Sequence, residues 1–214
     1  QQTIRIDGIE ANWDGLRPHL LMHGVRVLDA KQDQVLVFAE IKGTISWRSV
    51  LRGETNFHEI IIKQPALMIR RDVQGGLHIA GVALQSSEDQ GGFADWLLRQ
   101  RRVIIRQAAI FWHDELRAAP VLYLDNVNFR LQNDRGGGRH RFGLQARAPV
   151  DLIVGIDIRG DFSGISFKDW SAWQGRLFAD FRGVILENWL PWLSPPNGYE
   201  LAGGAGAFRA WLDI

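Results

Sequence analysis

The chain has 214 residues, of which 46% are apolar and 23% charged, a composition typical of a folded protein that is large enough to bury a core. Its 25 basic and 24 acidic residues leave a net charge of +1, which argues against nucleic acid as a partner. The absence of cysteine excludes disulfides, thiol catalysis and cysteine-ligated zinc.

Strands are predicted along most of the chain from the alternation of apolar and polar residues. The pattern is clearest at 39–47, where Ala39, Ile41, Gly43, Ile45 and Trp47 share one face of the strand. Similar alternation predicts strands at 3–13, 77–84, 121–131, 139–148, 152–162 and 175–181. The fold class is therefore mainly β.

Three short helices interrupt this pattern. The first is predicted at 46–53, between a capping Ser46 and Gly53. The second, at 93–101, places Phe93, Trp96 and Leu97 on one face. The third is predicted from Leu186, and Pro191 limits it to about one turn.

Four segments share a template in which the alternation shifts parity once, as a β-bulge or a sharp corner would require. They begin at Ile4, Ile60, Val103 and Leu122. In the segment that begins at Val103, the shift predicts a kink near Arg106 and Gln107. Recurrent bulges of this kind are a way to curl a sheet.

Two of these segments also resemble each other. Residues 60–72 and 103–115 align without a gap, and Ile61, Ile62, Gln64 and Ala66 have identical counterparts 43 residues later. Each follows a predicted short helix that contains Trp and Leu. We interpret 46–82 and 93–131 as two copies of one unit, within a single elongated body that spans 1–214.

Catalytic and metal-binding patterns are weak. His113 and Asp114 are adjacent in a strand, so their side chains should diverge where the strand ends. The basic run from Arg99 to Arg102 suits the solvated end of a helix. No glycine-rich segment matches a nucleotide-binding motif, and only His19 and His23, in a predicted strand, have the spacing of a helical zinc site. We therefore expect neither enzymatic activity nor a metal or cofactor.

The order of several motifs resembles a known family. These motifs occur at 9–29 ("IEANWDGLRPHLLMHGVRVLD"), within 45–82 ("ISWRSVL" and "PALMIRRDVQGG"), at 91–115 ("GGFADWLLRQRRVIIRQAAIFWHDE") and at 122–146. In this order they resemble the N-terminal periplasmic portion of the YhdP family of AsmA-like proteins of Gram-negative bacteria. The resemblance covers about two thirds of the chain in register and fades after residue 150.

The resemblance implies a fold and a role. It implies a long, curved antiparallel sheet with an open apolar trough, on the periplasmic side of the inner membrane. The anchor would be an N-terminal helix absent from this sequence, which agrees with our expectation that the chain is a segment of a longer protein. The implied function is phospholipid transport between inner and outer membranes, which supports the outer-membrane barrier. The resemblance does not identify protein partners in the envelope.

The family resemblance and the bent-strand pattern together predict the residues that line the trough. They are Ile62, Leu67, Ile69, Ile105, Ile110, Trp112, Leu124, Val127 and Phe129. The same pattern also describes a β-sandwich with a filled core. A structural or adaptor β-domain of the envelope is therefore the main alternative, and a hydrolase with scattered carboxylates is a more remote one.

Overall fold

The computed structural model describes residues 3–14, 17–28, 34–45, 57–79, 82–83, 95, 97–134, 138–149, 151–192 and 203–214. The strands of the N-terminal half are β1 (Thr3–Arg5), β2 (Gly8–Asp14), β3 (Arg17–Leu28), β4 (Gln34–Ile45), β5 (Phe57–Lys63), β6 (Ala66–Arg71), β7 (Leu77–Ile79) and β8 (Val82–Ala83). Those of the C-terminal half are β9 (Arg102–Asp114), β10 (Leu122–Asn133), β11 (Arg139–Arg147), β12 (Gly155–Ser163), β13 (Gln174–Ile185) and β14 (Ala205–Asp213).

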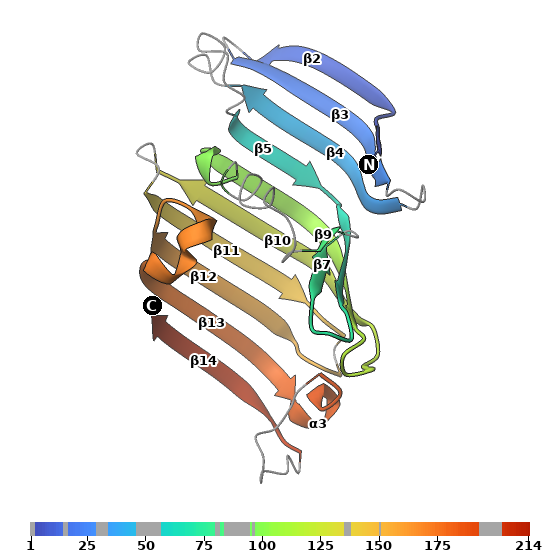
Figure 1. Cartoon of the computed structure of the whole chain (residues 1–214), viewed down its shortest axis with the longest axis vertical. Coiled ribbons are helices and arrows are strands. Elements are labelled where there is room, and N and C mark those ends of the chain that lie inside the picture. The colour runs from blue at the N-terminus through green and yellow to red at the C-terminus, as the bar shows by residue number, and fades with distance from the viewer. Residues whose placement is uncertain are drawn as a thin grey trace.

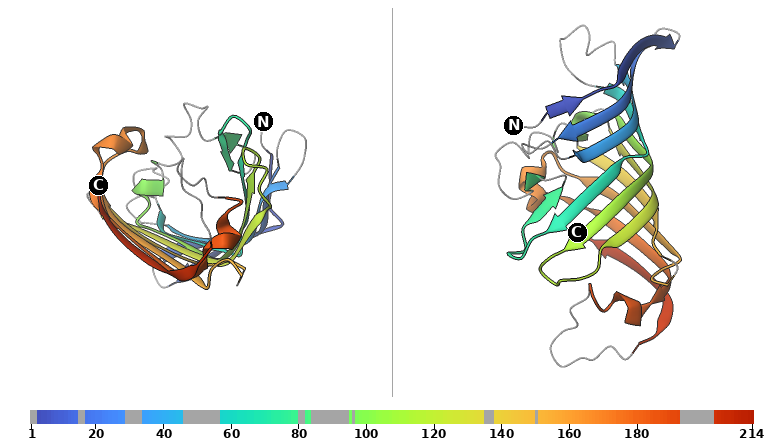
Figure 2. Two further views of the ribbon diagram at one scale, coloured as in Figure 1. Left: turned by 90° about the horizontal axis from the view of Figure 1, so that it is seen from below. Right: turned by 90° about the vertical axis from the view of Figure 1, so that its right-hand side faces the viewer.

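These strands form one 14-stranded sheet, so the predicted mainly β fold is confirmed. Its strands are stacked along the long axis of the molecule, from β2 at one end to β14 at the other (Figure 1). Viewed along that axis, the sheet curves into a trough (Figure 2, left). The short helices η1 (Phe167–Ala172) and α3 (Leu186–Trp189) lie on its concave side.

The sheet differs from the expected antiparallel one at a single junction of the described chain. β9 runs parallel to both β5 and β6, whereas the other pairings are antiparallel. Parallel neighbours need a crossover connection. The chain leaves β8, forms a helical turn at 97–99 and then enters β9 beside β5.

The repeat segments 60–72 and 103–115 meet at this junction. Ile61 pairs with Ile104, Ile62 with Ile105 and Ala66 with Ala109, so residues 43 positions apart in the sequence are lateral neighbours. The alignment of the two segments in the sequence is therefore also their register in the sheet. Because the parity shift falls at equivalent residues of the two segments, neighbouring strands bend at the same distance along their length.

The backbone confirms the corners predicted in the segments that begin at Ile60, Val103 and Leu122. Gln107 has a φ of 54°, and its repeat counterpart Gln64 has a φ of 50°. Asn126, with a φ of 47°, lies at the register shift between β9 and β10. Gly24 in β3 and Gly183 in β13 adopt the same left-handed conformation. A residue in this conformation breaks the alternation and bends the strand.

The helix predictions have different outcomes. The helix predicted at 46–53 lies outside the described residues. The second is observed as Asp95 and the turn at 97–99, and the third as α3. The sequence did not predict η1, because its residues "FKDWSA" carry no periodic apolar pattern.

Candidate functional site

The two faces of the sheet differ in chemistry. Directly paired residues of neighbouring strands point to the same face. On the concave face, one row that runs across the sheet contains one apolar residue from each of ten strands. This row, called the concave row below, consists of Ile9, Met22, Ile41, Ile62, Ile105, Phe129, Leu144, Ile158, Ala179 and Ala210.

The concave row is long and partly accessible. Nine strand spacings of about 4.8 Å give it a length of about 43 Å. Ala179 is buried at 9% exposure and Ile9 is 61% exposed, while the other eight residues have intermediate exposure. The apolar atoms of this face are therefore not sealed in a core along the length of the sheet.

All nine residues predicted to line a trough lie on this concave face. Ile62 and Phe129 both pair with Ile105, which places the three in the concave row. Val127, Ile110, Trp112 and Leu124 belong to, or pack against, a cluster that α3 contacts on the concave side. Ile69 pairs directly with Trp112, and Leu67 with Ile110, so these two residues share that face. Eight of the nine keep intermediate exposure, but Val127 is only 2% exposed.

Val127 belongs to a packed cluster at the end of the strands near α3. Its buried members are Ala108, Leu122, Val127, Ala146, Leu152, Ile153 and Ile156. Trp189 of α3 packs against this cluster, and its Nε1 donates to Leu152 O over 2.9 Å. This end of the concave face is therefore covered.

The opposite end of the strands carries a buried polar network that sequence reasoning missed. Asn133 Nδ2 donates to Leu97 O over 3.0 Å and to Gln100 O over 2.5 Å. His140, 2% exposed, has Nδ1 2.7 Å from Asn133 Oδ1 and Nε2 3.0 Å from Gly164 O. Gln100 Oε1 accepts from the Phe57 N–H over 2.8 Å. The network fixes the 97–99 turn against the sheet.

The convex face is rich in ion pairs. Arg139 and Arg141 both contact Asp161, and Arg159 forms two hydrogen bonds with Asp157. The hydrogen bond from Arg159 is the main cause that lowers the pKa of Asp157, and that from Arg139 has the same effect on the pKa of Asp161. Carboxylates with lowered pKa values do not suit general acid catalysis.

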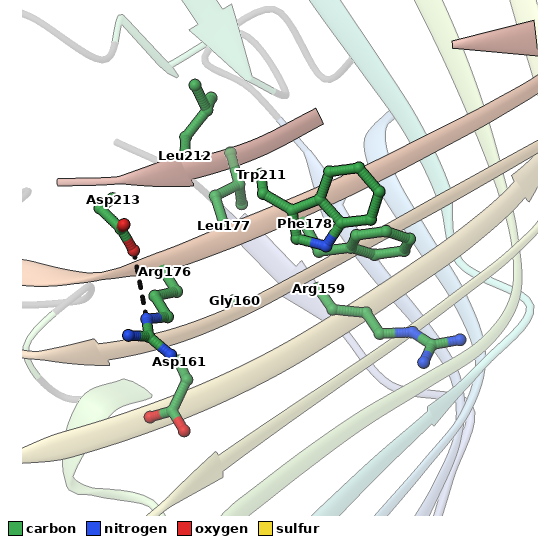
Figure 3. A pocket seen from close by; sticks show the side chains of 9 residues that line it. All are labelled: Arg159, Gly160, Asp161, Arg176, Leu177, Phe178, Trp211, Leu212 and Asp213. Carbon is green, nitrogen blue, oxygen red and sulfur yellow. Dashed lines mark hydrogen bonds and ion pairs between the residues drawn. The ribbon is translucent and has the colours of Figure 1, made fainter. Parts of the chain in front are cut away.

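A shallow hollow of about 250 Å³ lies on the convex face near the C-terminal edge. One wall is the row formed by Arg159, Phe178 and Trp211, whose two rings lie side by side (Figure 3). Opposite them, Arg176 Nε donates to Asp213 over 3.1 Å. The hollow thus combines two aromatic rings with paired charges and offers no candidate nucleophile and base.

The carboxylate of Asp114 pairs with arginines rather than with His113. Asp114 is 1% exposed, accepts hydrogen bonds from Arg71, and lies 3.6 Å from Nη1 of Arg117. Burial alone would raise the pKa of the Asp114 carboxyl, but these contacts and the Arg117 N–H outweigh it, so the pKa is lowered. Its role is to fasten the end of β9 to β6.

Within the described ranges, no group of three histidine, aspartate or glutamate side chains is arranged to hold a metal ion. No helix there is long and apolar enough to cross a membrane.

A comparison of the sequence with models of protein families identifies the family of this chain. The sequence model described as "YhdP protein" matches residues 1–214, the whole chain. The chain belongs to the YhdP family. The YhdP family is an AsmA-like family of envelope proteins and is not known for enzymatic activity. No curated protein and no solved structure matches the chain significantly.

Proposed function

We propose that this segment carries phospholipid acyl chains on its concave face, as the periplasmic part of an inner-membrane-anchored YhdP-family protein. It would act without enzymatic chemistry, in phospholipid transport between inner and outer membranes that supports the outer-membrane barrier. The observation that carries the proposal is the concave row, an unbroken apolar path across ten strands.

The apolar side chains of the concave row support the proposal on energetic grounds. An acyl chain that leaves a membrane needs apolar contact worth about 0.8 kcal/mol for each CH₂ group. Side chains of intermediate exposure such as Ile105 and Leu144 can supply that contact, because they are not yet fully covered by protein. The row runs across the strands, so a chain that lies along it would follow the long axis of the sheet.

Charged side chains on the convex face also favour binding of acyl chains to the concave face. The adjacent row there contains Glu10, Lys42, Arg130 and Arg159 among its ten members. An acyl chain on that face would cover charged groups at a cost in free energy. The other members include Leu21, Ile61, Ile104, Phe178 and Trp211, so the two rows differ in charge rather than in the presence of apolar side chains. The lack of charged residues in the concave row favours that face for acyl chains.

The packed cluster near α3 favours a second function, a structural or adaptor domain of the envelope whose apolar residues fill a closed core. Ile153 and Ala108 in this cluster are each 1% exposed, as a closed core requires. This description fits the covered end of the strands. It fits less well the concave row as a whole, in which eight of the ten residues keep intermediate exposure; Ile105, Leu144 and Ile158 of the row pack against the cluster.

Photo-crosslinking in cells separates the two functions. A crosslinking residue replaces Ile105, Phe129 or Leu144 in the intact protein, and matched variants carry it at the convex neighbours Ile104, Arg130 or Gln145. We expect phospholipid adducts at the three concave positions and at least tenfold fewer at their neighbours. Equal phospholipid adduct levels on both faces would refute selective binding to the concave face, and protein adducts alone on the concave face would refute lipid binding.

A further inference from the structure

A layer of aromatic rings covers part of the concave face between β10 and β13. The ring centroids of Phe129 and Phe142 are 6.3 Å apart, and those of Phe162 and Trp173 are also 6.3 Å apart. Between them, Phe142 and Phe162 lie 5.9 Å apart with their planes within 8° of each other. The rings follow one another from Phe129, a member of the concave row, to Trp173.

This layer rests on Gly160. Gly160 of β12 pairs directly with Phe142 of β11, so both face the concave side. A Cβ atom at position 160 would lie 2.3 Å from Phe162 Cε2 and 2.4 Å from Phe142 Cε1. The two rings therefore occupy the space that any other side chain at this position would need.

Gly160 is required for space rather than for its backbone conformation. It is not among the residues with positive φ, and glycine within a strand weakens the strand unless close packing demands it. Gly164 shows the same arrangement, since a Cβ there would lie 2.4 Å from Trp173 Nε1. At Gly175 a Cβ would first meet the backbone oxygen of Asp161, at 2.3 Å, and then Phe162 Cδ1, at 2.6 Å. Gly160 and Gly164 thus let the rings lie close to the sheet.

We propose that Gly160 sets the height of this aromatic layer and thereby controls whether an acyl chain can pass β12 along the concave face. This inference rests on the proposed function. A side chain at position 160 would need the space that the Phe142 and Phe162 rings occupy and would displace both rings on the concave face. Gly160 is accordingly a positioning residue that acts through the two rings.

The test compares lipid on the two sides of β12. A photo-crosslinking residue replaces Ile105 in β9 or Ala210 in β14 of the intact protein, and phospholipid adducts are quantified at both positions. Gly160→Leu is expected to change the ratio of the two adduct levels at least fivefold relative to the unsubstituted protein. An unchanged ratio in a variant that accumulates normally would overturn the proposal.

Gly143→Leu is the matched control. Gly143 lies in β11 on the opposite face, and no atom is within 4 Å of the position of its Cβ. The same substitution there is expected to leave the ratio unchanged, and an equal change in both variants would also overturn the proposal.

Two further variants keep the test decisive if Gly160→Leu does not accumulate. Gly160→Ala adds only one carbon and is expected to change the ratio about twofold. Adding Phe162→Ala to Gly160→Leu frees room for the new side chain and is expected to restore the ratio. If neither effect is seen, Gly160 has no such role. Absence of adducts at both positions of the unsubstituted protein would instead refute the proposed function itself.

Discussion

Asp114 is the charged side chain on which the end of β9 depends. Its carboxylate is buried and paired with Arg71, and removing one partner of a buried pair leaves the other uncompensated. We expect Asp114→Asn to lower the free energy of unfolding by about 3 kcal/mol at pH 7, measured by chemical denaturation. The control is Asp161→Asn, whose exposed arginine pairs should be worth less than about 1 kcal/mol. Equal losses of stability in the two variants would contradict the larger contribution of the buried Asp114 pair.

The pH dependence of stability follows from the same residue. Because the pKa of Asp114 in the folded state lies below its ordinary value of 3.8, ionised Asp114 stabilises the fold fully above that value. This contribution disappears as the pH falls through the lowered pKa. Denaturation from pH 7 to pH 2 should therefore show a constant difference between the unsubstituted protein and Asp114→Asn at neutral pH, which narrows below 3.8. A difference in stability that stays constant down to pH 2 would contradict the stabilising role of ionised Asp114.

At the scale of elements, Asn133 connects β10, β11 and the 97–99 turn. Its side chain bonds to Leu97 O, Gln100 O and His140. Asn133→Ala leaves these buried groups unpaired and should cost about 2 to 3 kcal/mol. Hydrogen exchange at 97–100 should rise in parallel. Asn128→Ala, which removes a partly exposed amide, is the control; equal exchange in both variants would exclude a fastening role for the network.

The corners make a separate prediction about backbone conformation. Gln107 has a φ of 54°, where glycine is tolerated and a β-branched residue is strained. Gln107→Val should lower the free energy of unfolding by about 2 kcal/mol, whereas Gln107→Gly should stay within about 1 kcal/mol of the unsubstituted protein. Thermal and chemical unfolding of both variants provide the measurement. Equal stability of the two variants would argue against a left-handed corner at this residue.

These elements also show what the sequence can predict. The kink at Gln107 was predictable because side-chain alternation is a local property, and a parity shift within ten residues reveals it. The parallel pairing of Ile62 with Ile105 was not predicted, since it depends on how the chain crosses the sheet between them. The network of Gln100, Asn133 and His140 joins residues up to 40 positions apart, and no local pattern indicates such contacts.

At the scale of the whole molecule, the sheet separates two chemistries. The nine residues predicted to line a trough lie on one face because the period of two places alternate residues of every strand there. Their exposure depends on what covers the face, which periodicity does not encode: Val127 is buried beneath the α3 end, while Phe129, two residues later, keeps intermediate exposure. Nine of the ten residues of the concave row are at least partly exposed, which the proposed transport of acyl chains requires.

The most direct test is to measure phospholipid that co-purifies with the intact protein, by lipid extraction and mass spectrometry. Leu144→Asp places a charge in the concave row, and Gln145→Asp places the same charge on the convex face one residue away. The account predicts phospholipid in near-stoichiometric amounts with the unsubstituted protein and with Gln145→Asp, and at least a fivefold loss with Leu144→Asp. Lipid-free unsubstituted protein, or equal amounts of lipid in both variants, would contradict it.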